Sequence, residues 1–241
     1  MGSAMVRPSH LSTPMKRASV LAAIVAVVGL QTARAVVITQ PADPIGGGQA
    51  NGETTGSIFT IGGVGTTGDT WPAAEAPGFA IDGLLTTKYL NFGKTLTGYV
   101  VTPSAGPSIV TGLFLSTAND SPARDPFTFS LFGSNSVTAS NVTGTVFNLS
   151  NFTQIVLDAS TNLTTDPGRN TADPTQPTFA NSTAYTTYLL VFPTVRDAAS
   201  ANSMQIGEAE LTGTLVPEPS TGVLLGLASL GCLARRRRPA V

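Results

Sequence analysis

The segment from Asp82 to Thr87 has residue types that could bind a hard cation. Asp82 is followed directly by Gly83, and the hydroxyl residue Thr87 comes five positions after the aspartate. A loop of this kind can wrap around an ion, with backbone carbonyls supplying the remaining oxygen ligands that calcium prefers. The alternative interpretation is an ordinary Asp-Gly turn that binds no ion.

The run Arg124-Asp125-Pro126 is a second group with defined chemistry. The guanidinium of Arg124 can form a bidentate pair with a carboxylate, either Asp120 or Asp125, and so fix the loop. The proline then sets the entry to the next strand. Arg124 could instead offer its guanidinium to a sugar hydroxyl, but we expect the structural role to dominate.

Recognition of a sugar by a β-sheet protein requires aromatic faces and planar polar groups at one rim of the fold. Most aromatic residues of this chain are more simply explained as core residues. Trp71 stands beside Pro72 in a polar stretch, so we expect it to be the most exposed aromatic residue. The ligand-contacting candidates are Trp71, Asn91, Asn119, Arg124 and Arg169.

Catalysis is disfavoured by the residues that the central part of the chain lacks. The only histidine is His10 and the only cysteine is Cys232, so the long segment between them has neither. Ser-His-Asp and Cys-His catalysis and ordinary zinc sites are thereby excluded from that segment. A glycosidase needs only two carboxylates, but no Asp or Glu stands in a motif that indicates a raised pKa. We therefore predict no catalytic residue.

The net charge of −1 conceals a strongly acidic central segment. Four arginines close the chain and four basic residues precede residue 36, so only five basic residues face all fourteen Asp and Glu between residues 36 and 234. That segment carries a net charge of −9. An acidic surface of this kind repels phosphate backbones, so nucleic acid is not an expected partner.

The N-terminal region has the pattern of a secretory signal peptide, which we assign to residues 1–35. Lys16 and Arg17 precede an apolar run from Ala18 to Leu30. That run is shorter than the ~20 residues of a membrane-spanning helix, although a membrane anchor is the alternative interpretation. Ala33 and Ala35 supply the small residues that signal peptidase requires.

Between the two ends, the sequence predicts short strands joined by turns. Residues 36–56 are rich in Gly, Pro and polar residues and read as a linker or a first strand, and we expect one β-sandwich domain over 57–215. In Phe127-Thr128-Phe129-Ser130-Leu131 the apolar residues alternate with hydroxyl residues, so both phenylalanines and the leucine should share one face. Predicted strands are 57–61, 98–102, 109–116, 127–132, 145–149, 153–157, 185–192 and 204–215.

The last residues, 216–241, form a tail in three parts. Pro217-Glu218-Pro219 breaks the last strand, an apolar run continues to Ala234, and the cluster Arg235-Arg236-Arg237-Arg238 follows. The arginines favour the cytoplasmic side of a membrane. This tail resembles the PEP-CTERM sorting signal of Gram-negative bacteria. The resemblance implies export, transient contact of a short hydrophobic helix with the inner membrane, processing by an exosortase, and association with extracellular polysaccharide. A plain C-terminal membrane anchor is the alternative.

The middle of the chain resembles the discoidin, or coagulation-factor type C, domains and the family-32 carbohydrate-binding modules. These are galactose-binding-like jelly rolls, so the resemblance implies an all-β jelly-roll sandwich. It departs from those families at Tyr89, where they usually have a tryptophan. The matching segments are Ala80–Gly83 with Thr87–Phe92, Ala118–Asp120 with Arg124–Pro126, Leu131–Asn135, Ala184–Tyr188 and Gln205–Leu211.

The resemblance also implies a structural calcium ion, because the corresponding family loop is closed by a glutamate from the last strand. Carried over by position, the side-chain ligands would be Asp82, Thr87 and Glu208. The implied carbonyl ligands belong to Phe79, Leu85 and Gly207.

Two functions remain open at this point. The first is an exported, non-catalytic protein that binds polysaccharide at the cell surface or in the extracellular matrix. The second is a structural surface or matrix protein with no defined sugar ligand. A glycoside-acting enzyme is a third and weaker alternative.

Overall fold

The structure is a computed structural model that describes residues 35–47, 49–50, 59–61, 64–65, 70–139 and 147–216. Apart from Ala35, the predicted signal peptide, including Ala33, lies outside these residues, as does the sorting tail from Pro217 onward. In the part of the chain that is described, no helix is long and apolar enough to cross a membrane.

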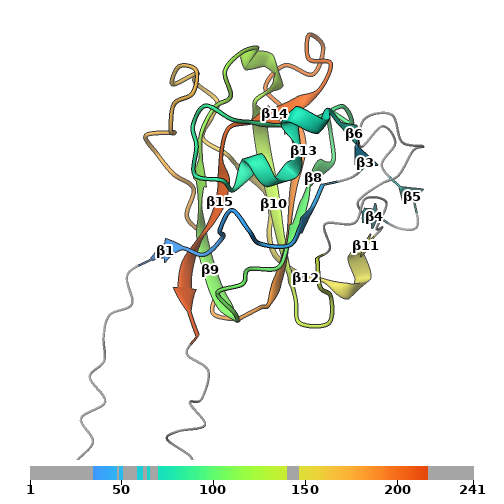
Figure 1. Cartoon of the computed structure of the whole chain (residues 1–241), viewed down its shortest axis with the longest axis vertical. Helices are drawn as coiled ribbons and strands as arrows, with labels where there is room; N and C mark the ends of the chain where they lie inside the picture. The colour runs from blue at the N-terminus through green and yellow to red at the C-terminus, as the bar shows by residue number, and fades with distance from the viewer. Residues whose placement is uncertain are drawn as a thin grey trace, which may run out of the picture. The chain divides into compact units, whose positions relative to one another are not determined.

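The larger sheet has five antiparallel strands in the order β12-β10-β13-β8-β2. Its central strand β13 pairs with β10 on one side and with β8 on the other (Figure 1). The strands are β2 (Ile45–Gly46), β8 (Thr97–Val101), β10 (Pro126–Ser134), β12 (Thr153–Ser160) and β13 (Thr187–Val195).

The facing sheet has three antiparallel strands in the order β1-β15-β9. They are β1 (Val36–Val37), β9 (Ser108–Leu115) and β15 (Ala209–Leu215). The outer edge of β9 is covered by the long connection between β12 and β13, through isolated bridges from Ser116 to Ala172 and from Gly112 to Thr178. The edge is therefore paired rather than open to other chains.

Short elements complete the fold around these two sheets. Strand β14 (Met204–Ile206) pairs with β7 (Tyr89–Asn91) and lies just before β15. The remaining elements are β3 (Gln49–Ala50), β4 (Phe59–Ile61), β5 (Val64–Gly65), β6 (Thr70–Trp71), β11 (Phe147–Asn148), and the 3-10 turns η1 (Ala73–Glu75), η2 (Pro77–Ala80), η3 (Pro122–Arg124) and η4 (Leu149–Asn151).

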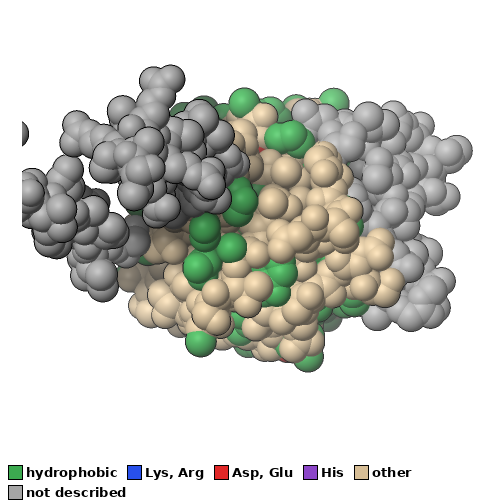
Figure 2. All heavy atoms as spheres, turned by 90° about the horizontal axis from the view of Figure 1, so that it is seen from below, with side chains coloured by type: hydrophobic (Ala, Val, Ile, Leu, Met, Phe, Trp, Pro, Cys, Tyr) green, Lys and Arg blue, Asp and Glu red, His purple; other side chains and the backbone are tan. Residues whose placement is uncertain are grey.

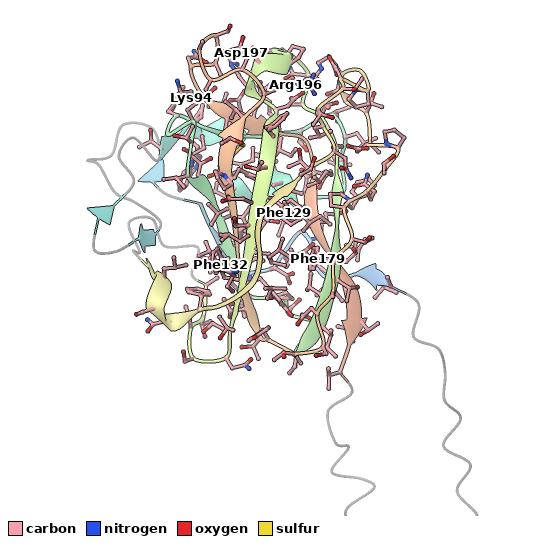
Figure 3. The ribbon with its side chains drawn as sticks, turned by 180° about the vertical axis from the view of Figure 1, so that it is seen from behind. Lys94, Phe129, Phe132, Phe179, Arg196 and Asp197 are labelled. Atoms are coloured by element: carbon pink, nitrogen blue, oxygen red, sulfur yellow. The ribbon has the colours of Figure 1, made fainter. Side chains whose placement is uncertain are left out.

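The core lies between the two sheets and follows from the alternation of apolar residues along each strand. On β10, Phe129 and Leu131 are buried in this core, and the Phe129 ring lies 5.9 Å from that of Phe179 (Figure 3). Phe132 belongs to a second, smaller cluster on the other face of the same strand. Phe127, predicted on the core face, is 40% exposed because it lies at the edge of the core, before a register shift in β10.

The predicted all-β jelly-roll sandwich is confirmed. Among the described residues of 36–56, Val36 and Val37 pair with β15, and Ile38 is fully buried in the core. The predicted strand over 204–215 is divided into β14 and β15, because the chain turns at Gly207 and Glu208. That interruption creates the candidate site described next.

Candidate functional site

Glu208 is a fully buried carboxylate whose oxygens lack a well-formed hydrogen bond among the described residues, although the Asp82 carboxyl and the Gly83 N–H both act on its pKa. Its backbone N–H donates to Ser116 Oγ at 2.8 Å, and its carbonyl accepts from the Ser116 N–H at 2.9 Å. The preceding Gly207 approaches Ser116 so closely that a Cβ there would lie 2.6 Å from Ser116 Oγ. The backbone is thus fixed, whereas neither carboxylate oxygen of Glu208 is held by a well-formed hydrogen bond among the described residues.

Asp82 stands beside Glu208 in the loop that follows η2. Both of its carboxylate oxygens accept from Thr87 Oγ1 at 2.9 Å, and one also accepts from the Leu84 N–H at 2.9 Å. Burial, reinforced by Asp82 and Glu210, raises the pKa of Glu208 to about 8. Two carboxyl groups from distant parts of the sequence therefore meet with no cationic side chain between them.

This arrangement fits a hard cation better than it fits an empty turn. An unpartnered buried carboxylate is costly, and a cation held by oxygen ligands removes that cost. The described residues contain no group of three Asp, Glu, His or Cys side chains that would form a complete metal shell. Any ion here would also need Thr87 and carbonyl oxygens, which is the ligand set implied for Phe79, Leu85 and Gly207.

Asp125 is the second fully buried carboxylate at this end of the sandwich, and it is paired. Arg169 donates to its two oxygens at 2.9 and 2.7 Å, and Arg196 Nη2 lies 3.0 Å from Oδ2. The hydrogen bonds with Asp125 and Asp166 raise the pKa of Arg169 above its ordinary value. Burial raises the pKa of Asp125, and the hydrogen bonds and charge of Arg169 together with the charge of Arg196 act in the opposite direction. We call Asp125, Arg169 and Arg196 the arginine clamp.

The predicted role of Arg124 therefore belongs to other arginines. Arg124 Nη1 lies 3.8 Å from Asp120 Oδ1, which is too far for a bidentate pair. The bidentate partner of Asp125 is Arg169, which the sequence analysis assigned to a ligand. Because Arg124 lies in η3 immediately before Asp125, its side chain remains partly exposed while the clamp forms beneath it.

The loop that contains Asn119, Asp120 and Arg124 forms a rim at the same end, and we call it the polar rim. Asn119 is exposed, and the side chain of Asp120 is 51% exposed. Nearly buried Lys88 supports the rim from below, with Nζ 3.2 Å from Asp120 Oδ1 and 3.3 Å from Glu75 Oε1. Burial works against these contacts, but the hydrogen bonds from Lys88 and Gln205 lower the pKa of Asp120.

Two predicted ligand contacts are wrong in their expected exposure. Trp71 is only 7% exposed and belongs to the hydrophobic core, because the polar stretch around it folds its ring inward. Asn91 is fully buried, and its amide donates to the Gly47 carbonyl at 3.1 Å and to the Tyr89 hydroxyl at 2.7 Å. Its Oδ1 accepts from the Gly93 N–H at 2.8 Å. Asn91 therefore serves the interior of the fold.

A polar hollow of about 340 Å³ lies between residues 162–167 and 173–175. Asn162 joins its two walls, because its Nδ2 donates to the Thr175 carbonyl at 2.7 Å. Its lining is hydroxyl-rich and contains Asn162, Thr164, Thr165, Pro167, Asp173, Pro174 and Thr175. The hollow and the polar rim are connected through Arg169, which contacts both Asp166 and the Asp120 carbonyl.

Lys88 and Gln205 were not predicted as parts of this end. Gln205 donates from Nε2 to the Asp120 carbonyl across 85 positions of sequence, and Arg196 reaches the Leu163 carbonyl. No local signal identifies these residues, since each acts through a contact that only the folded chain creates. Only Lys88 stands next to a predicted site, because it directly follows Thr87 of the cation loop and precedes a buried strand.

Comparison with solved structures finds proteins that are similar in fold. They include the family 32 carbohydrate-binding module of Clostridium perfringens NanJ in complex with galactose, which is 10% identical over 74% of this chain and 99% of its own, with a TM-score of 0.47. A second is CpGH89CBM32-5 of Clostridium perfringens with GalNAc-β-1,3-galactose, at 13% identity, 73% and 99% coverage and a TM-score of 0.45. A third is a fucolectin from striped bass serum, at 17% identity, 61% and 45% coverage and a TM-score of 0.41.

Comparison with curated proteins gives no match. Residues 215–238 match the model of the PEP-CTERM protein-sorting motif. The predicted sorting signal is thereby confirmed, and the motif indicates an exported protein that is sorted through an exosortase.

Proposed function

We propose that this protein is an exported, non-catalytic polysaccharide-binding protein that acts at the cell surface or in the extracellular matrix through its polar rim. The observation that carries the proposal is the pre-organisation of that rim. Asn119, Asp120 and Arg124 are presented to solvent by one short loop, which Lys88 and Gln205 hold in place and the arginine clamp fixes at its base.

The chemistry of the rim suits a neutral sugar. An amide, a carboxylate and a guanidinium together offer planar donors and acceptors to neighbouring hydroxyl groups. The acidic charge of the central segment disfavours an anionic polymer unless a cation bridges the two. A single contact of this kind contributes only about 0.5–1.5 kcal/mol, so strong retention would depend on many copies along one polymer.

The absence of catalysis is part of the proposal. A raised pKa such as that of Glu208 would suit a general acid, but the residue is fully buried and no substrate can reach it. Asp125, the other buried carboxylate, is held by two arginines and is not free to exchange a proton. Neither group therefore supports a glycoside-acting enzyme.

The proposal includes a structural calcium ion at Asp82, Thr87 and Glu208, with carbonyls of Phe79, Leu85 and Gly207 as further ligands. The unpartnered oxygens of Glu208 support it. Such an ion would join the loop after η2 to the start of β15 and thereby stabilise the end of the sandwich that carries the polar rim.

The route to the surface completes the proposal. Signal peptidase would cleave after Ala35, and the apolar run of the tail would hold the protein in the inner membrane until an exosortase processes it. The sorting motif at 215–238 supports this sequence of events.

The test is retention of the intact protein on immobilised neutral and acidic polysaccharides in the presence of calcium. We expect retention on at least one neutral polymer, and we expect Asn119→Ala and Arg124→Ala to weaken it. Lys94→Ala is the matched control, because Lys94 is a cation at the same end whose Nζ donates to the Ala198 carbonyl. Absence of retention on every polymer would favour the structural surface or matrix protein instead.

A further inference from the structure

The two ends of the sandwich differ sharply in charge. At one end, which we call the charged end, ion pairs run from Glu75 through Lys88 and Asp120 to Arg124, and the arginine clamp lies beside them. Figure 3 shows Lys94, Arg196 and Asp197 at this same end. The clustering leaves the opposite end to be built from other residue types.

The opposite end is formed by loops that meet one another through hydrogen bonds. Thr102 Oγ1 and Thr187 Oγ1 lie 2.8 Å apart, and the Asn135 amide donates to the Ala184 carbonyl. The described residues of these loops, 102–108, 134–139 and 184–187, include no Lys, Arg, Asp or Glu. Asp43, whose carboxylate accepts from Ser104 in the first of these loops, is only 2% exposed. We call this surface the neutral end.

Exposed apolar residues lie at the neutral end, where the first and the last described strands of the sandwich run close together. Val36, Val37 and Leu215 are 47%, 48% and 45% exposed, and Val216 is 37% exposed. They lie together because β1 pairs with β15 and the Val216 N–H donates to the Pro107 carbonyl. Seen from below in Figure 2, the area not covered by grey atoms shows apolar and neutral polar side chains and scarcely any charged ones.

The sorting motif begins at this same surface. It covers residues 215–238, so its apolar run and its arginines follow directly from the last residue of the neutral end. An eight-residue strand such as β9 spans about 26 Å, which separates the charged end from the neutral end by more than two Debye lengths of about 10 Å at 0.1 M salt. A membrane next to the neutral end would therefore be largely screened from the acidic groups.

We propose that the neutral end is a lipid-facing surface, which lies against the membrane while the tail is inserted and directs the polar rim away from it. The proposal rests on the tail anchoring included in the proposed function. An anionic lipid surface repels acidic side chains, whereas exposed valine and leucine side chains tolerate its interfacial region. Exposed apolar residues also occur elsewhere, for example Leu84 and Leu157, but without the combination of charge-free loops and the tail exit.

The experiment uses the full chain in vesicles of phosphatidylethanolamine and phosphatidylglycerol that contain a spin-labelled quencher lipid. A fluorophore is attached through Ala105→Cys at the neutral end or Ala199→Cys at the charged end, both in a Cys232→Ser background. The native Cys232, labelled in a third sample, reports insertion of the tail. We expect Ala105→Cys to be quenched several-fold more than Ala199→Cys.

Introduction of negative charge provides the second measurement. Val36→Glu combined with Val37→Glu, both outside the sorting motif, should abolish the difference between the two labelled positions, whereas Leu157→Glu, on the exposed part of β12, should preserve it. Equal quenching at Ala105→Cys and Ala199→Cys, with Cys232 quenched, would overturn the lipid-facing surface while leaving tail anchoring intact. If Cys232 itself is not quenched, anchoring fails and the lipid-facing surface fails with it.

Discussion

Asp125 and Glu208 are both fully buried carboxylates at the charged end, yet their surroundings are opposite. Asp125 accepts two hydrogen bonds from Arg169 and lies 3.0 Å from Arg196. Neither oxygen of Glu208 has a well-formed hydrogen bond among the described residues, and the charged groups that act on its pKa are the acidic residues Asp82 and Glu210. The charge of Asp125 is compensated by arginines within the fold, whereas the charge of Glu208 can be compensated only by a proton or a bound cation.

This difference indicates which of the two sites makes the stability of the protein depend on pH and calcium. A buried carboxylate with fixed cationic partners is compensated within the fold, and its removal leaves those partners uncompensated. A buried carboxylate without partners makes stability depend on what the solution supplies. The two sites should therefore respond differently to substitution, calcium and pH.

The largest effect is expected for Asp125→Ala. This change leaves the mostly buried Arg196 without its carboxylate partner and leaves Arg169 with Asp166 alone, and breaking a buried pair typically costs about 3–5 kcal/mol. Urea denaturation of the intact protein should show that loss in the free energy of unfolding. Asp197→Ala, which removes an exposed carboxylate at the same end that accepts from the Ala199 and Ser200 N–H groups, is the control and should lower the midpoint far less. A small effect of Asp125→Ala on the free energy of unfolding would show that the ion pairs of the arginine clamp do not form in solution.

The second expectation concerns calcium at Glu208. Binding to the native state alone stabilises it by about 2.7 kcal/mol when free calcium is one hundred times the dissociation constant. A chelator should therefore lower the melting temperature, and Glu208→Gln and Asp82→Ala should remove the difference between calcium and chelator. Glu210→Gln is the matched control, because Glu210 lies two positions further along β15 and is not among the expected ligands. If the melting temperature of the unaltered protein is the same with calcium and with chelator, the calcium site is contradicted.

The third expectation is a pH dependence in calcium-free buffer. The pKa of Glu208 is raised from 4.5 to about 8 in the folded chain, so the folded state binds its proton more tightly than the unfolded state. Stability should fall as pH rises between these two values, with a slope of at most about 1.4 kcal/mol per pH unit. Below 4.5 and above 8 this contribution is constant.

In saturating calcium, the free energy of unfolding should depend less on pH over this window, since a bound cation favours the ionised carboxylate of Glu208. Glu208→Gln should flatten the calcium-free slope as well. Stability that rises with pH over this window, in the unaltered protein without calcium, would mean that Glu208 is compensated by another group.

The sequence predicted the strands better than it predicted the site. Alternating apolar residues and turn clusters are local signals, and the observed β8, β9, β10 and β13 lie within two or three residues of the predicted ranges at most of their ends. The position of Asp82 and Glu208 followed from the family resemblance, which carries long-range information that no local pattern contains.

The errors have a common physical origin. Polar neighbours suggested that Trp71 is exposed, but burial is decided by the core into which the ring folds. The partner of Asp125 was sought next to it in sequence, whereas Arg169 reaches it from 44 positions away. Ion pairs depend on the packing of separate loops, so composition and periodicity do not determine them.

The smallest effect on stability, and the sharpest test of the polar rim, is expected for Arg124→Ala. The only ion pair of Arg124 among the described residues is at 3.8 Å with a half-exposed carboxylate, and such surface pairs contribute about 0–1 kcal/mol. Its removal should barely shift the urea midpoint, yet it should weaken retention on the polysaccharide that the intact protein binds. Arg169→Ala should have a large effect on the free energy of unfolding and a smaller effect on retention. It opens the arginine clamp directly and disturbs the loop above it only as a consequence. If Arg124→Ala destabilises the protein as strongly as Arg169→Ala, then Arg124 is part of the fold rather than of a binding surface, and the division between clamp and rim is wrong.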